Sequence, residues 1–126
     1  MTEATRALVR KRAHARCEYC RLRQADAPFL KHQIEHVVPR QHGGGDDPAN
    51  LALACYRCNK YKGPNLTAFD PRTSRVVRLF DPRRQRWPDH FSVRGLLILG
   101  RTATGRATVE LLRMNAEKRR SLRGQL

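Results

Sequence analysis

Two pairs of cysteines constrain the fold of this chain more than any other feature. Two residues separate Cys17 from Cys20 and Cys55 from Cys58, and 34 residues lie between the pairs. Four thiolates in two such pairs supply the tetrahedral ligand set that structural zinc requires. Two disulfides are the alternative, but the N-terminus does not resemble an export signal, and disulfides are rare in a reducing compartment. A redox motif would need only one such pair, which argues against a redox function. We therefore predict a structural zinc site.

The charge balance indicates the class of partner. Lys and Arg number 26 against 11 Asp and Glu, which gives a formal net charge of +15. A field of that strength attracts polyanions, so nucleic acid is the expected partner. A merely soluble basic surface and a ribosome-associated protein are the alternatives, and charge does not indicate whether the nucleic acid is cut. No apolar run is long enough for a membrane helix. We expect a cytoplasmic protein that is a monomer or a weak dimer.

The segment around the cysteines reads as alternating short elements. The pattern predicts a helix over 2–16, a strand over 29–38, a glycine-rich loop over 41–50 and a buried strand over 51–54. A short helix should begin at the second cysteine pair and end near Gly63-Pro64. The middle of the chain therefore reads as strand, loop, strand and helix.

The remainder reads as a small extension. Strands are predicted over 75–80, 91–93 and 96–99, with turns at Asp70-Pro71 and Asp81-Pro82. One helix follows with an apolar face, and a last basic helix over 116–123 could be capped by Asn115. The apolar face consists of Ala103, Ala107, Leu111 and Met114. We expect one α+β domain over 1–126, with a zinc-stapled core over 1–66 and a β-hairpin and helix extension over 67–126.

Polar residues between the cysteine pairs could carry chemistry. Glu35 and His36 are adjacent, and Asn50 and Asn59 follow them in the chain. A carboxylate beside an imidazole, with a second oxygen ligand on a nearby helix, can hold a hard divalent cation. The imidazole can then act as a general base on water, and the metal can stabilise the leaving oxygen of a phosphodiester.

The segment from Cys17 to Gly63 resembles the HNH, or ββα-metal, endonucleases of the subtype with four zinc-binding cysteines. The resemblance rests on Glu-His, the glycine loop, Asn-Leu and Cys-x2-Cys-Asn-x2-Lys-Gly, with Asn59 nine positions after Asn50. It implies a ββα-metal core that hydrolyses DNA and leaves a 5′-phosphate and a 3′-hydroxyl.

The resemblance also implies a role for each polar residue. His36 matches the general base, and Asn50 matches the Asn that holds the loop and the base in place. Glu35 and Asn59 match the two protein ligands of the catalytic metal. Asn59 stands where the family often has His, and an oxygen donor there favours Mg or Mn.

Two features of this match need a structural answer. Glu35 is one methylene longer than the Asp that the family often carries, which could displace the ion. Residues 35 and 36 of an ideal strand point to opposite faces, so both can serve one site only if the backbone bends near Val37.

Basic residues flank the expected site. Arg40, Lys60 and Lys62 are predicted to bind phosphates on either side of the scissile bond, and a solvated basic face is the alternative. Two other functions stay open from the sequence. One is a non-catalytic zinc module that binds nucleic acid, and the other is a nuclease directed at RNA.

Overall fold

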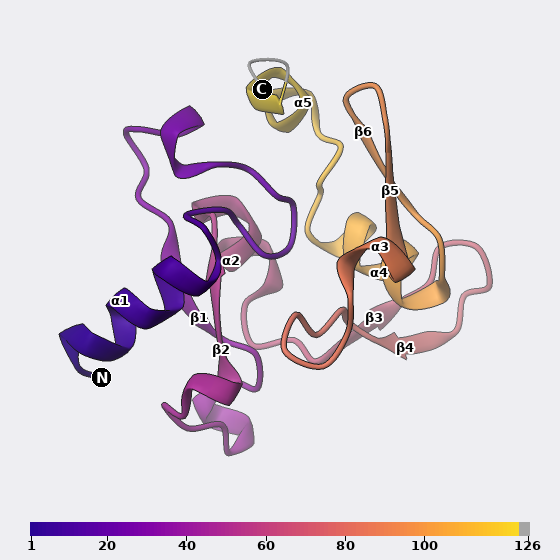
Figure 1. Cartoon of the computed structure of the whole chain (residues 1–126). Coiled ribbons are helices and arrows are strands. Elements are labelled where there is room, and N and C mark those ends of the chain that lie inside the picture. The colour runs from indigo at the N-terminus through magenta and orange to yellow at the C-terminus, as the bar shows by residue number, and fades with distance from the viewer. Residues whose placement is uncertain (124–126) are drawn as a thin grey trace.

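The computed structural model describes residues 1–123 as an α+β arrangement of short elements (Figure 1). Within residues 1–123, six strands form three separate two-stranded antiparallel sheets, β1 with β2, β3 with β4 and β5 with β6. The strands are β1 (Gln33–His36), β2 (Leu51–Ala54), β3 (Thr67–Phe69), β4 (Val76–Arg78), β5 (Phe91–Arg94) and β6 (Leu97–Gly100). The helices are α1 (Glu3–Arg12), α2 (Tyr56–Lys62), α3 (Trp87–His90), α4 (Ala103–Leu111) and α5 (Glu117–Arg123). The predicted fold class is confirmed.

No helix among residues 1–123 is both long and apolar enough to cross a membrane.

Helix α1 is shorter than the sequence predicted. The Thr2 hydroxyl accepts a hydrogen bond from the Thr5 N–H at 3.1 Å and so caps its start. The helix ends at Arg12 rather than near residue 16, because His14 and Ala15 take left-handed backbone conformations with φ of 54° and 56°. Two successive residues of this kind turn the chain out of the helix and toward the first cysteine pair.

The β1–β2 hairpin and α2 form the predicted strand, loop, strand and helix. The register pairs Gln33 with Ala54 and His36 with Leu51. All four residues of β2 are buried, because α1 and α2 both contact this strand. The predicted strand over 29–38 contracts to four residues. Its first part leaves the sheet as the Gln24 amide donates hydrogen bonds to the carbonyls of residues 27 and 30.

The C-terminal elements follow the predicted order with two differences. Strands occur within or close to the three predicted ranges, and β3 is an additional strand that pairs with β4. The Asn115 side chain does not cap α5. Its Oδ1 accepts from the Ile98 N–H at 2.9 Å and its Nδ2 donates to the Ile98 carbonyl at 2.8 Å. Asn115 therefore fastens the chain before α5 to strand β6.

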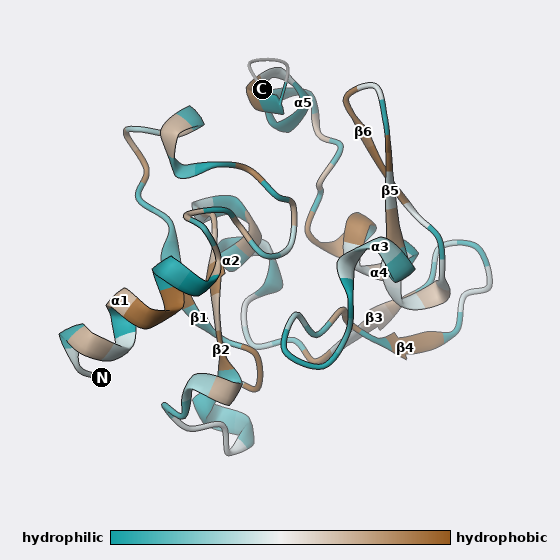
Figure 2. Ribbon diagram, viewed as in Figure 1, coloured by the Kyte–Doolittle hydropathy of each residue, from teal (hydrophilic) through white to brown (hydrophobic). Residues whose placement is uncertain are grey.

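One buried cluster draws on both parts of the chain. Phe80 packs edge-on against Tyr19 and Phe91, with ring centroids 6.4 Å and 5.1 Å apart. The same cluster contains the four cysteines, Leu112 and Met114. Trp87 is partly buried and packs against this cluster, with its ring 5.0 Å from Phe91 and its Nε1–H donating to the Tyr19 carbonyl. Figure 2 shows the contrast between the hydrophobic strand β2 and the largely hydrophilic α5.

Candidate metal centre and active site

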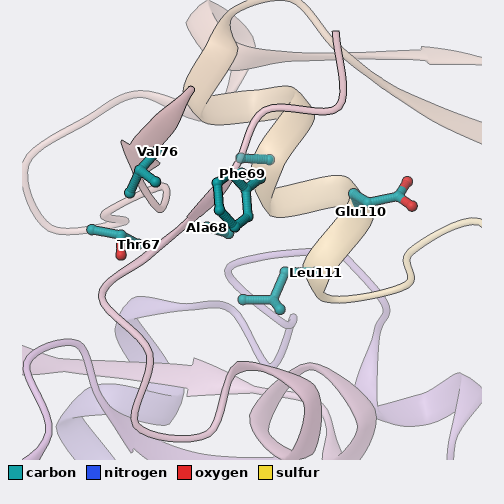
Figure 3. A pocket seen from close by; sticks show the side chains of 7 residues that line it. Thr67, Ala68, Phe69, Val76, Glu110 and Leu111 are labelled. Carbon is teal, nitrogen blue, oxygen red and sulfur yellow. The ribbon is translucent and has the colours of Figure 1, made fainter. Parts of the chain in front are cut away.

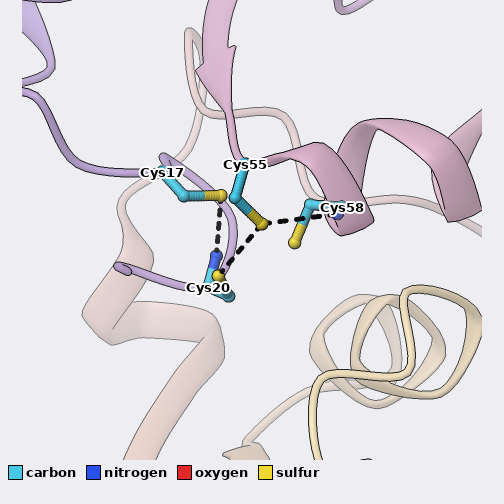
Figure 4. A group of neighbouring side chains, drawn as sticks. All are labelled: Cys17, Cys20, Cys55 and Cys58. Atoms are coloured by element: carbon cyan, nitrogen blue, oxygen red, sulfur yellow. Dashed lines mark hydrogen bonds between the residues drawn. The ribbon is translucent and has the colours of Figure 1, made fainter. Parts of the chain in front are cut away.

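The two cysteine pairs converge on one point (Figure 4). Their four Sγ atoms all lie within 4.8 Å of one another, and the Cys20 and Cys55 sulfurs are 3.7 Å apart. A tetrahedral zinc ion with bonds of about 2.3 Å would space its sulfur ligands by about 3.8 Å. The predicted cluster therefore exists, and its dimensions are compatible with zinc. Among residues 1–123 it is the one group of three or more Cys, His, Asp or Glu side chains close enough to share an ion.

Local turns hold the thiols in this arrangement. The Cys17 sulfur accepts from the Cys20 N–H, and the Cys55 sulfur accepts from the Cys58 N–H, each at 3.4 Å. Cys55 is the N-cap of α2 and directly follows β2. Burial raises the pKa of the Cys17 and Cys58 thiols well above the ordinary range. Four buried sulfurs can all ionise only if a cation offsets their charge.

A residue distant in sequence already supplies one positive charge. Arg119 of α5 is only 3% exposed, and its guanidinium donates to the Cys58 sulfur at 3.0 Å and to the Leu112 carbonyl at 2.7 Å. The sequence patterns do not predict this contact. No local pattern distinguishes Arg119 from the other arginines of the basic C-terminal helix.

Asn50 fastens the glycine loop to the end of β1. Its Oδ1 accepts from the Val38 N–H at 2.9 Å, and its Nδ2 donates to the carbonyls of Val38 and Gly45 at 3.0 Å and 2.9 Å. Gly44 lies so close that a Cβ atom there would be 1.6 Å from the Val38 carbonyl oxygen. This loop conformation therefore needs glycine at position 44 and an amide at position 50.

His36 lies beside this loop and contacts a residue that the sequence analysis did not select. Its Nε2 is 2.7 Å from Oδ1 of Asp46, and Nη2 of Arg40 is 2.7 Å from the same oxygen. The hydrogen bond with His36 is the main cause that lowers the pKa of Asp46, and Arg40 adds to it. Asp46 follows the three glycines directly, but this position alone did not mark it as a partner of the imidazole.

Glu35 is buried and its carboxylate is already partnered. The Tyr19 hydroxyl donates to Oε2 at 2.7 Å, and Nζ of Lys62 forms an ion pair with Oε1 at 2.5 Å. Burial raises the pKa of Glu35, although Lys62 and Tyr19 oppose that shift. Glu35 thus connects the first cysteine turn to helix α2. A metal ion at Oε1 would have to replace the Lys62 ammonium.

The structure corrects the prediction that Lys62 contacts phosphate. The residue is only 2% exposed, and its ammonium also donates to the Val37 carbonyl at 3.1 Å. Its charge is neutralised inside the protein, because β1 and the start of the loop fold over the end of α2. The other two predicted contacts, Arg40 and Lys60, are exposed.

Three of the four polar residues of the predicted site line one open hollow of about 460 Å³, and Asn50 is not among its lining residues. These three are Glu35, His36 and Asn59, and Arg40 also lines the hollow. Glu35 and His36 therefore meet at one space although they alternate along β1. Asn59, on α2, donates a hydrogen bond to the Gln33 side chain. His32 lies elsewhere, packed at 1% exposure with its Nε2 2.9 Å from the Leu22 carbonyl.

A second hollow lies between β3 and α4 and has a different character (Figure 3). Its volume is about 370 Å³, and its lining is mostly apolar, with Phe69, Val76 and Leu111 among the side chains. Glu110 is the one titratable residue among its lining residues. This combination offers no acid–base pair, so we assign it no catalytic role.

Comparison with known proteins identifies the segment that carries both sites. Residues 17–65 match the family model described as HNH endonuclease. The matched segment contains the four cysteines, Glu35, His36, Asn50 and Asn59, and it ends before β3 begins. No curated protein and no solved structure shows a significant match to the chain.

Proposed function

We propose that this protein is a metal-dependent endonuclease that hydrolyses phosphodiester bonds in DNA, because residues 17–65 match the family model described as HNH endonuclease. The main support is the hollow in which Glu35, His36 and Asn59 meet, within the segment that matches the family. The net charge of +15 suits a polyanionic substrate.

In this proposal His36 is the general base. Its side chain is 19% exposed and lines the hollow, so a water molecule there can reach the imidazole. The imidazole takes a proton from that water, the water oxygen bonds to phosphorus, and the bond from phosphorus to the 3′ oxygen breaks. The 3′ oxygen takes a proton from solvent, which leaves a 3′-hydroxyl and a 5′-phosphate. Asn50 keeps the loop beside the base through its three hydrogen bonds.

Glu35 and Asn59 would hold the catalytic divalent ion. Carboxylate and amide oxygens suit Mg or Mn, and both side chains line the same hollow as His36. When bound, such an ion stabilises negative charge on the phosphate and on the leaving oxygen. Binding at Glu35 requires Lys62 to withdraw from Oε1, because the two groups are now 2.5 Å apart.

The cysteine cluster would hold a zinc ion that serves the fold alone. The four residues are at most 3% exposed, so substrate cannot reach them. Their ligation would fix β2 relative to α2, since Cys55 and Cys58 stand at that junction. Asn59 directly follows Cys58. The turn that would bind zinc therefore also determines the position of Asn59, the proposed ligand of the divalent ion.

Arg40 and Lys60 are proposed to contact the phosphates of the substrate. Both are exposed, and Arg40 lies at the hollow itself. We further propose that residues 1–126 act as one domain, because the buried cluster combines residues from both parts of the chain. The last three residues lie outside the described part. We also propose that the protein is cytoplasmic and is a monomer or a weak dimer.

A non-catalytic module that binds nucleic acid is the second candidate. The observation in its favour is the engagement of both Glu35 oxygens by Tyr19 and Lys62. If that engagement persists in the presence of divalent ions, Glu35 has a structural role and the hollow lacks its carboxylate ligand.

Cleavage of supercoiled plasmid tests the proposal. Zinc-loaded wild type should nick or linearise the plasmid with Mg or Mn and leave it intact when neither ion is added. His36→Ala should reduce the rate by about 10²-fold to 10⁴-fold, the range for loss of a general base. The matched control is His42→Ala, which removes an exposed imidazole from the adjacent turn and should cleave like wild type.

Leaving out the divalent ion is better than adding a strong chelator, which would also strip zinc. A parallel assay with RNA of the same sequence distinguishes the substrate classes. If wild type binds plasmid but leaves it intact with every ion, the binding module becomes the better description. Cleavage that persists in His36→Ala contradicts the assignment of the base.

A further inference from the structure

We propose that Asp46 is a positioning residue for His36, and that it directs Nδ1 of the imidazole toward the water that attacks phosphorus. The inference deepens the proposed nuclease function and rests on it. Neither the family match nor the sequence analysis assigns a role to Asp46.

The contact determines which nitrogen carries the proton. Nε2 of His36 lies 2.7 Å from Oδ1 of Asp46, and an ionised carboxylate can only accept hydrogen bonds. The bonded nitrogen must therefore be the one that holds hydrogen. In a neutral imidazole the other nitrogen, Nδ1, then has its lone pair free, and only that nitrogen can accept a proton from water.

The surrounding chain keeps the carboxylate in place. Asp46 directly follows Gly45, whose carbonyl accepts a hydrogen bond from Asn50 at 2.9 Å. The close approach of Gly44 to the Val38 carbonyl leaves this loop little freedom. Asn50 thus orients the base indirectly, through the loop that carries Asp46.

Two cations face the same carboxylate. Nη2 of Arg40 is 2.7 Å from Oδ1, and the amino group of Met1 is 3.6 Å from Oδ2. They favour the ionised form of Asp46, which is the form that accepts from Nε2. When Nδ1 takes a proton from water, the positive charge on the ring faces this carboxylate. Asp46 can therefore stabilise the protonated base as well as select its tautomer.

Charge and positioning predict different effects on kcat when Asp46 is removed. If its negative charge acts only through the overall field, its loss should strengthen the binding of DNA and leave the chemical step unchanged. If it positions His36, its loss should lower kcat while KM stays the same or falls.

The experiment compares Asp46→Ala and Asp46→Asn with Asp47→Asn. The Asp47 variant is the matched control, because it removes the same charge one residue away, and Asp47 accepts from the Ala49 N–H at 2.8 Å rather than from His36. Under steady-state cleavage we expect kcat of Asp46→Ala to fall by roughly 10-fold to 100-fold. Asp47→Asn should stay close to wild type. Asp46→Glu, which keeps the carboxylate, should recover part of the loss.

A second measurement does not depend on cleavage. The ¹⁵N shifts of the His36 ring, assigned against His36→Ala, report which nitrogen is protonated. We expect the Nε2–H tautomer in wild type and in Asp47→Asn, and a mixture of tautomers in Asp46→Ala. A thermal melt of each variant establishes that it is folded before its rates are compared.

The outcomes separate this inference from the proposed function. An unchanged tautomer in Asp46→Ala, or an equal loss of kcat in Asp47→Asn, overturns the role of Asp46 while the nuclease stands. If wild type does not cleave, the nuclease proposal fails, and the positioning role fails with it. The tautomer measurement then still shows whether the contact between Asp46 and His36 forms.

Discussion

The cysteine cluster and the hollow lined by Glu35, His36 and Asn59 lie within the same 49-residue match but are built in opposite ways. The cluster is buried, and its four sulfurs face one another with one guanidinium against them. The hollow is open, and its polar groups are bonded to protein partners such as Lys62 and Asp46. The first arrangement suits an ion that stays for the life of the fold. The open hollow suits a ligand that binds reversibly.

The difference concerns free energy as well as geometry. Ligation of a structural ion contributes directly to folding, because the unfolded chain does not present the site. The hollow leaves His36 and Asn59 partly accessible, which contributes little to stability and is useful only when substrate binds. Substitutions in the cluster should therefore reduce the stability of the fold, and substitutions in the hollow should reduce the rate of cleavage. The exception is the buried ion pair between Glu35 and Lys62, which lies beside the hollow.

Loss of the cluster's ion should have the largest effect. Structural zinc contributes about 10–16 kcal/mol in small modules, more than most domains can lose. We expect Cys58→Ala, or removal of zinc by a chelator, to abolish the cooperative unfolding transition seen by circular dichroism. Elemental analysis should find one zinc per chain in wild type. A metal-free chain that melts cooperatively near the wild-type temperature would contradict a structural role for the cluster.

Lys62 should be the exception among the residues near the hollow. Lys62→Met removes one partner of a buried ion pair and leaves the Glu35 carboxylate without its cation, at a cost of about 3–5 kcal/mol. The measurement is denaturant-induced unfolding at neutral pH.

The double variant Glu35→Gln/Lys62→Met is the control for the Lys62 prediction. It removes both charges and should recover most of the lost stability. If Lys62→Met alone costs less than about 1 kcal/mol, the value of an exposed ion pair, then Glu35 does not depend on Lys62. In that case Glu35 is free to bind a divalent ion.

Arg119 should have a smaller effect that appears at the metal. Arg119→Met removes the guanidinium from the Cys58 sulfur and leaves the Leu112 carbonyl without this donor. We expect a loss of stability of about 1–3 kcal/mol and a fall in zinc affinity of about 10-fold to 100-fold. Competition with a chromophoric chelator measures the affinity. Lys118→Met is the matched control, because Lys118 is exposed on the same helix. Equal zinc affinities in the two variants would contradict a role for α5 at the metal centre.

The smallest effect should come from a pair outside both sites. Arg106 donates to both Asp70 oxygens at 2.9 Å, and this interaction holds the pKa of the buried Asp70 below its usual range. The ionised form therefore stabilises the fold above the unfolded-state pKa of about 3.9, and this contribution is lost as pH falls below it. The stability difference between wild type and Asp70→Asn should narrow as the pH falls through 4. A difference that is independent of pH would contradict the assignment. Zinc ligands titrate in both proteins, so the comparison isolates Asp70.

Sequence analysis predicted the local parts of the fold well. The cysteine spacing identified the cluster, and the apolar run identified β2. Gly63-Pro64 marked the end of α2. Its errors occurred where a distant partner decides the outcome. The Gln24 side chain bonds to the carbonyl of residue 30 in the first part of the strand predicted over 29–38, which therefore shortens to β1. The Asn115 side chain bonds to Ile98 instead of capping α5.

The candidate site shows the same division. By itself the sequence determined which chemical groups are present, because an imidazole, a carboxylate and two amides at a given spacing need no tertiary information to be recognised. Tertiary structure alone decided their partners. Lys62 is turned inward to Glu35, Asp46 is brought to His36, and Arg119 reaches Cys58 from 61 residues away. The reason is physical: residue patterns report which surfaces of a local element are polar, whereas burial and charge pairing depend on what the rest of the chain places against them.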